Sequence, residues 1–81
     1  MKKSTKKAIK NYVSNGCDPG LFLKSVLRDS LVKAFIHADD EDLRDLQEIV
    51  SYMWNDVPSS VWGSEERVNR HLASFRQGVE L

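Results

Sequence analysis

The chain has 81 residues, of which 41% are hydrophobic and 30% charged, and its twelve basic and twelve acidic residues leave no net charge. This mixture is typical of a globular domain and excludes a disordered chain. A single domain of this size buries only about 60% of the surface of its unfolded chain. Such a small core disfavours a self-contained enzyme with a deep active site and favours an oligomer.

Membrane, export and disulfide signals are missing from the sequence. No apolar stretch approaches the ~18–20 residues of a membrane span, and no apolar signal-peptide core follows the lysine-rich start. The single Cys17 excludes an intrachain disulfide and a multi-cysteine zinc site. We therefore expect a soluble, intracellular protein.

Charge is unevenly distributed along the chain. Residues 1–10 hold five lysines and no acid, whereas residues 39–48 hold six acids against Arg44 alone. The candidate partner or nucleic-acid surface consists of Lys3, Lys6, Lys7 and Lys10. These lysines could bind nucleic acid, form a solvated helix face, or meet the acidic segment of another subunit. The neutral total charge argues against a dedicated duplex-DNA binder.

Helical periodicity predicts an all-α domain, a compact bundle of four to five short helices over residues 1–81, with 1–3 and 78–81 as flexible ends. The first helix should cover residues 4–15 and end before Gly16, which suits a left-handed position. Its inward stripe consists of Ala8, Ile9, Tyr12 and Val13. The pattern of residues 19–38 fits one bent helix or two, and we favour two, 19–27 and 31–38. Asp18 can cap the first of them.

The third and fourth of these helices have wide apolar stripes. The inward positions predicted for 31–38 are Leu31, Ala34, Phe35 and Ala38. Asp39 should cap the next helix, and Pro58 should end it. Its stripe consists of Leu43, Leu46, Val50, Met53 and Val57, widened by Ile49 and Trp54. Helical spacing places Trp54 in the core or a subunit interface.

Ser64 is a natural N-cap for the last helix, residues 65 to about 76, which Gly78 should end. Its Val68, Leu72 and Phe75 should lie on one face.

Catalytic and metal-binding patterns are not found. His37 and His71 lie in separate predicted helices without a recognisable motif, and Cys17 follows a helix C-terminus, which does not activate a thiol. The acids at 39–42 lack EF-hand spacing and fit a helix start instead. We therefore predict no enzyme, no metal and no cofactor.

The turn Trp62-Gly63-Ser64 is the most suggestive candidate ligand site. A glycine before a capped helix lets backbone N–H groups approach a ligand, Trp62 could stack on a base, and Arg67 could meet a phosphate. Lys24 and Arg28 flank the expected break in the middle of the chain and could line a polar pocket. The competing interpretations are that Trp62 plugs the end of the bundle while Ser64 simply caps, and that Lys24 and Arg28 are solvated.

Motifs spread over residues 12–72 resemble a group of small uncharacterised proteins of tailed bacteriophages and prophages. They include Gly16 and the Pro19-Gly20 pair, and the most distinctive part is the Trp62-Gly63-Ser64 turn with Pro58. The resemblance implies a phage context and the cytoplasm of a host bacterium, but it assigns no activity or site residues. Small phage accessory proteins often act by binding a host component.

The sequence therefore predicts a non-enzymatic, homo-oligomeric phage protein that antagonises a host defence or regulatory system. It would either sequester an immune signalling nucleotide or block a host protein complex. The alternative is a nucleic-acid-binding regulator that uses the lysine-rich helix, and a structural role in the virion is a third possibility.

Overall fold

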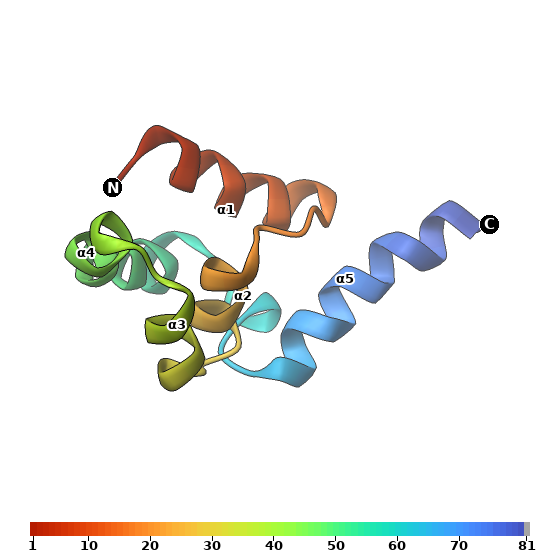
Figure 1. Cartoon of the computed structure of the whole chain (residues 1–81). Helices are drawn as coiled ribbons and strands as arrows, with labels where there is room; N and C mark the ends of the chain where they lie inside the picture. Colours follow the sequence, from red (N-terminus) through yellow and green to blue (C-terminus); the bar gives the residue numbers. More distant parts are fainter. Residues whose placement is uncertain (81) are drawn as a thin grey trace.

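Five α-helices and one 3₁₀ turn build the chain in a computed structural model that describes residues 1–80, and side chains for residues 1–75 (Figure 1). They are α1 (Lys3–Asn15), α2 (Leu21–Leu27), α3 (Leu31–His37), α4 (Asp40–Asp56), η1 (Ser59–Val61) and α5 (Glu65–Glu80). Residues 1–80 contain no strand, so the predicted all-α bundle is confirmed. Leu81, part of the predicted flexible end, lies outside the described residues.

Helix α1 is amphipathic, as predicted, and it is anchored at its C-terminal end. Ile9 and Tyr12 are fully buried, and the Tyr12 hydroxyl donates to the Val61 carbonyl oxygen at 2.6 Å. Gly16 ends the helix with φ +66°. A Cβ at Gly16 would overlap the ring of Phe75, so the close approach of α5 to α1 requires a glycine there.

The predicted break between α2 and α3 is confirmed, with Asp29 in a left-handed conformation at φ +60°. Helix α2 begins at Leu21 rather than at residue 19, and Asp18 does not cap it. The Asp18 carboxylate instead accepts a hydrogen bond from the Gly20 N–H at 2.9 Å, which stabilises the turn before the helix.

The predicted inward face of α3 is wrong for two residues. Ala34 is buried against the core and Ala38 is half-buried, but Leu31 and Phe35 are 66% and 51% exposed. The physical reason is that α3 has only seven residues and packs mainly on α2, which covers one side of it.

Helix α4 starts with the predicted cap. The Asp39 carboxylate accepts from the Asp42 N–H at 2.8 Å, and the Asp42 carboxylate accepts from the Asp39 N–H at 3.1 Å, which completes a capping box. Ile49, Met53 and Val57 are buried.

Of the two places predicted for Trp54, the core is wrong, because its side chain is 78% exposed in the single chain, and the subunit interface stays a prediction. The apolar residues of α4 cover a wider arc than its neighbours do. Leu43 and Val50 share the uncovered edge with Trp54, at 40% and 41% exposure.

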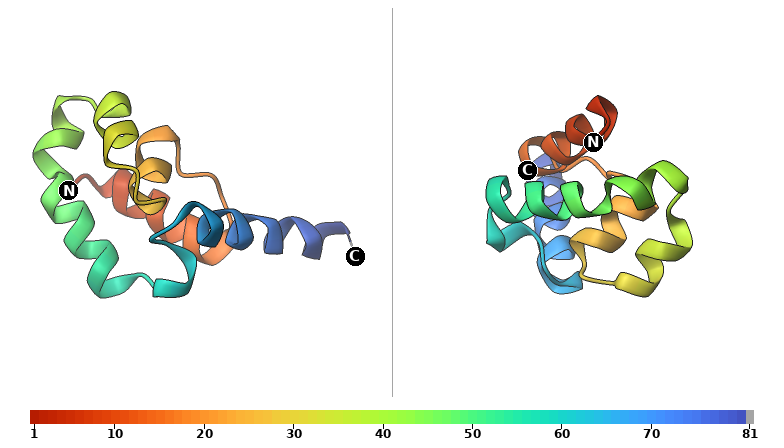
Figure 2. Two further views of the ribbon diagram at one scale, coloured as in Figure 1. Left: turned by 90° about the horizontal axis from the view of Figure 1, so that it is seen from below. Right: turned by 90° about the vertical axis from the view of Figure 1, so that its left-hand side faces the viewer.

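Helix α5 begins at Glu65, directly after Ser64, whose hydroxyl accepts from the Arg67 N–H at 3.1 Å, so the predicted cap is confirmed. The predicted end before Gly78 is wrong, since the helix continues to Glu80. A glycine inside a helix costs about 1 kcal/mol but does not forbid helical geometry. The last turns of α5 extend away from the other helices (Figures 1 and 2).

The core lies where α1, α2 and α4 meet the start of α5, in a molecule of 41 × 24 × 20 Å. It consists of Ile9, Tyr12, Phe22, Leu23, Leu27, Ala34, Ile49, Met53, Val57 and Val68. Within the described residues, no helix is both long and apolar enough to span a membrane.

Candidate functional site

The Trp62-Gly63-Ser64 turn joins three elements of the fold. The indole N–H of half-buried Trp62 donates to the carbonyl oxygen of Val57 at 3.3 Å, and the Gly63 N–H donates to that of Leu27 at 2.6 Å. Gly63 has φ +98°, which a side chain would strain. The turn therefore ties the ends of α4 and α2 to the start of α5, as expected if Trp62 closes one end of the bundle.

Arg67 folds back over this turn. Its Nη1 donates to the carbonyl oxygens of Ser59 and Trp62 at 3.1 and 3.4 Å. Part of the guanidinium group that could meet a phosphate is therefore already bonded to the backbone of its own loop.

Arg28 and Lys24 also have partners within the chain. The Nη2 of Arg28 donates to the Asn69 side-chain oxygen at 2.7 Å, and its buried Nε has no hydrogen-bond partner among the described residues. Lys24 Nζ lies 2.5 Å from the Asp18 carboxylate, and this hydrogen bond holds the Asp18 pKa below its ordinary value. Trp62, Gly63, Ser64 and Arg67 thus surround one turn, Arg28 reaches α5, and Lys24 points to the α1–α2 loop.

The lysine stripe, defined as Lys3, Lys6, Lys7 and Lys10, is exposed along one side of α1. The Lys6 ammonium lies over the Tyr52 ring at 5.5 Å from the centroid, and none of the four lysines forms an ion pair within residues 1–75. Among residues 1–75, this stripe is the largest group of exposed cations without an acidic partner.

The chain start and the acidic segment of α4 pair within one molecule. Lys2 Nζ lies 2.7 Å from the Glu41 carboxylate, and the terminal amino group of Met1 contacts Glu48 and Asp45. Hydrogen bonds to Glu48 and Glu41 raise the pKa of the Met1 amino group and of Lys2. The opposite charges of the chain start and the acidic segment, which could have joined two subunits, therefore partly pair within one chain.

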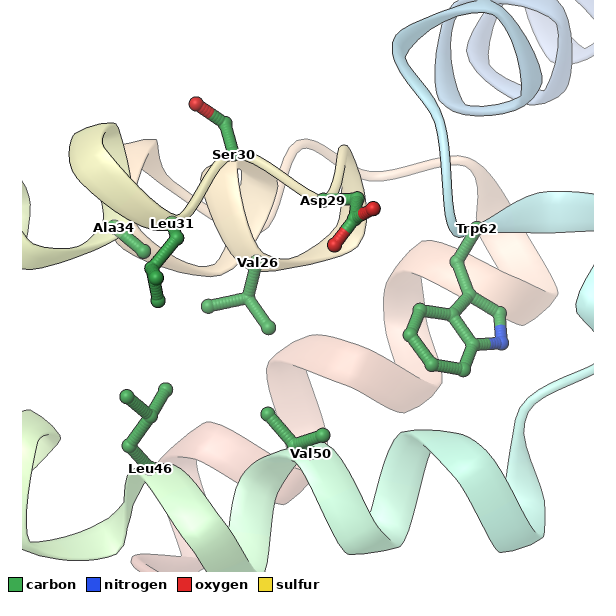
Figure 3. A pocket seen from close by; sticks show the side chains of 8 residues that line it. All are labelled: Val26, Asp29, Ser30, Leu31, Ala34, Leu46, Val50 and Trp62. Carbon is green, nitrogen blue, oxygen red and sulfur yellow. The ribbon is translucent and has the colours of Figure 1, made fainter.

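An apolar pocket of about 120 Å³ opens between the α2–α3 segment and α4 (Figure 3). Leu31 and Leu46 face each other at one end, Val26 and Val50 at the middle, and the Trp62 indole lies at the other end. Ala34, Asp29 and Ser30 complete the lining. Small-molecule sites usually enclose about 300–1,000 Å³, so this pocket has room for one large side chain rather than a nucleotide. Of the predicted ligand-binding residues, only Trp62 lines it.

A second hollow, of about 350 Å³, lies between α1 and α4. Lys10 is the one cation among its lining residues, and Asp56 lies in the same lining, so its charge does not favour a phosphate group.

Around the apolar pocket the chain exposes several large hydrophobic side chains. We define the α3–α4 apolar face as the exposed large apolar residues of these two helices: Leu31, Val32, Phe35, Ile36, Leu43, Val50 and Trp54. Leu31 and Val50 line the pocket, Phe35 lies one turn after Leu31, and Trp54 one turn after Val50. The sequence signal was the apolar character of α3 around most of its circumference, which is typical of a helix covered on several sides.

The histidines and the cysteine form no reactive group. His71 Nε2 contacts the Tyr12 carbonyl oxygen at 2.7 Å, and its ring packs edge-on against Tyr12 and Phe75, which gives it a structural role. His37 and Cys17 are exposed. No group of three or more metal-ligating side chains is found in the described part of the chain.

The sequence matches no family model, and searches of curated proteins and of solved structures also found no similar protein.

Proposed function

We propose that the protein is a non-enzymatic binding protein that blocks a host protein complex, contacting its target through the α3–α4 apolar face. The observation that carries the proposal is this face itself, because exposed apolar patches of such extent mark protein-binding surfaces. The resemblance to small phage and prophage proteins supplies the setting, an accessory protein that acts in the cytoplasm of the infected bacterium.

The geometry favours a protein target over a signalling nucleotide. A nucleotide site needs cations free to meet phosphate, but Arg67, Arg28 and Lys24 are engaged by groups of their own chain. The pocket beside Trp62 is apolar and holds one side chain. An aromatic or aliphatic anchor of a partner protein fits this chemistry, as in the centres of protein interfaces.

The test is affinity capture from bacterial lysate with the tagged chain and with Val32→Glu and Ile36→Glu variants. Both residues are exposed in the single chain, so the variants should fold. A specifically captured protein should be lost from both variants and retained by Leu21→Glu, which places the same charge on exposed α2 surface. Equal capture by all four proteins, or capture of nothing, would contradict the proposal.

The exposed lysine stripe favours a second candidate, nucleic-acid binding by α1. Its four ammonium groups lie at positions 3, 6, 7 and 10, which share one side of a helix. Four phosphate contacts would give a slope of about −3.6 in a plot of log affinity against log salt on duplex DNA.

This candidate is tested by substitution rather than by deletion, because Ile9 of the same helix belongs to the core. Lys6→Ala with Lys7→Ala should lower the salt slope by about 2, and Lys33→Ala on α3 should leave it unchanged. Binding that keeps its full slope in the double variant would remove α1 from consideration.

A further inference from the structure

The area of the α3–α4 apolar face is large for so small a molecule. With ordinary side-chain areas, the exposed fractions of its seven residues leave on the order of 800 Å² of apolar surface, about what each partner contributes to a standard interface. Monomeric proteins rarely expose apolar patches beyond about 300–600 Å². A face of this size is expected to be covered in the free protein.

Helix α3 in particular lacks the burial that usually holds a short helix in place. It has seven residues, and Ala34 is the one it buries. Helices much shorter than ~12 residues are marginal without tertiary packing. A second copy of the chain is present wherever the protein is made and would provide this packing.

The charges at the edge of the face are mixed. The exposed Lys33 and Arg44 directly follow Val32 and Leu43 in the sequence. Exposed Asp40 precedes Leu43 by three residues on α4, and Asp29 lines the apolar pocket. A two-fold axis brings each part of a surface against another part of the same surface, so an edge that holds both signs can match itself. A strongly acidic or basic edge would repel a second copy.

The face also holds a projection and a hollow. The Trp54 side chain is 78% exposed, and the apolar pocket beside Val50 lies one helical turn away on the same side of α4. In a two-fold pair, the Trp54 of one protomer can be placed against the pocket of its partner. Aromatic side chains seated in apolar pockets are frequent anchors of protein interfaces.

We propose that the free protein forms a two-fold homodimer in which the α3–α4 apolar faces of two copies cover each other. This homodimer shares its surface with the proposed function but does not otherwise depend on it. It would regulate target binding through that surface. A host target must compete with the second copy for the same residues, so target binding converts dimers into target-bound chains.

The first measurement is sedimentation equilibrium of the purified full chain from about 1 to 100 μM, where a twofold increase in mass is expected. Val32→Glu and Ile36→Glu should each weaken self-association at least about tenfold, since a carboxylate would be buried in the interface. Leu21→Glu, on α2, should associate as the unchanged protein does. Circular dichroism establishes that each variant is folded.

The second measurement follows Trp54 directly. In a Trp62→Phe background, Trp54 is the remaining tryptophan, and its emission should shift to the blue and its quenching by acrylamide should fall as the concentration rises. A monomeric mass with freely quenched Trp54 at 100 μM, or an oligomer that survives both α3 substitutions, would overturn the proposal. Purified protein alone is used, so the outcome is independent of whether a host target is captured.

Discussion

Helices α1 and α3 differ in how far they bury an isoleucine. Ile9 of α1 is completely buried, whereas Ile36 of α3 is 70% exposed. Helix α1 is long, has one apolar side and one lysine side, and is held at its end by Tyr12 and Gly16. Helix α3 is short and apolar on most sides, and α2 covers only one of them. The comparison teaches that two helices with apolar residues can differ in how much of their apolar surface the chain itself covers.

The largest difference in stability is expected between alanine substitutions of the two isoleucines. Ile9→Ala should lower the free energy of unfolding by about 2–5 kcal/mol, because it leaves a cavity in the core. Ile36→Ala should change the free energy of unfolding by less than about 0.5 kcal/mol at low protein concentration, because the Ile36 side chain is mostly exposed in a single chain. Urea unfolding of both variants measures the difference, and equal losses would remove the distinction between the two helices.

A smaller effect is expected at the junction of α1 and α5. Gly16→Ala should destabilise the fold by about 2–3 kcal/mol, because the new methyl group would overlap the Phe75 ring at a positive φ. The matched control is the same substitution in a Phe75→Ala background, where the ring is absent and the αL backbone of Gly16 is unchanged. Thermal unfolding compares the two, and an equal loss in the Phe75→Ala background would show that the backbone conformation alone matters.

Tyr12 should make the stability of the fold depend on pH in the alkaline range. Burial raises the pKa of Tyr12 to about 12. The pKa of Tyr12 in the folded protein therefore lies above the ordinary value near 10. The contribution of neutral Tyr12 to the free energy of unfolding is complete below pH 10 and is lost as the pH rises toward 12.

Tyr12→Phe should cost about 1 kcal/mol at neutral pH, through loss of the hydrogen bond to Val61. Its deficit relative to the unchanged protein should shrink above pH 10. Urea midpoints at pH 7 and pH 11 test this, with Tyr52→Phe as the control, and a deficit that stays constant would contradict it.

The smallest effect concerns the start of α4. A hydrogen bond from the Asp42 N–H, assisted by Lys2, holds the Asp39 pKa below its ordinary value. Its contribution is therefore present above about pH 4 and is lost as the pH falls through the folded pKa.

Asp39→Asn keeps a cap-forming side chain but removes the charge, so it should flatten the loss of stability between pH 5 and pH 3. Asp39→Ala removes both and should lower stability at each pH. An acid limb of unchanged slope in Asp39→Asn would show that other carboxylates govern it.

What the amino-acid sequence determined by itself was the order and the ends of the helices. The Asp39 capping box, Gly16 and Ser64 act through contacts within four residues, so their effect can be read locally. Two ends are exceptions. A glycine such as Gly78 weakens a helix without having to end it, and α2 begins at Leu21 because Asp18 accepts from the Gly20 N–H in the preceding turn instead of capping the helix.

Only the tertiary structure decided which apolar sides are covered and which polar groups are free. Leu31, Phe35 and Trp54 follow the same spacing as buried residues, but their side chains stay more than half exposed in the part of the chain that the structure describes. The sequence gives no sign that Arg28 and Lys24 have hydrogen-bond partners. In the structure Arg28 binds Asn69 on α5, and Lys24 binds Asp18 in the turn before α2. Helical periodicity reports which side chains share a face, whereas burial depends on a neighbour that folding has to bring there.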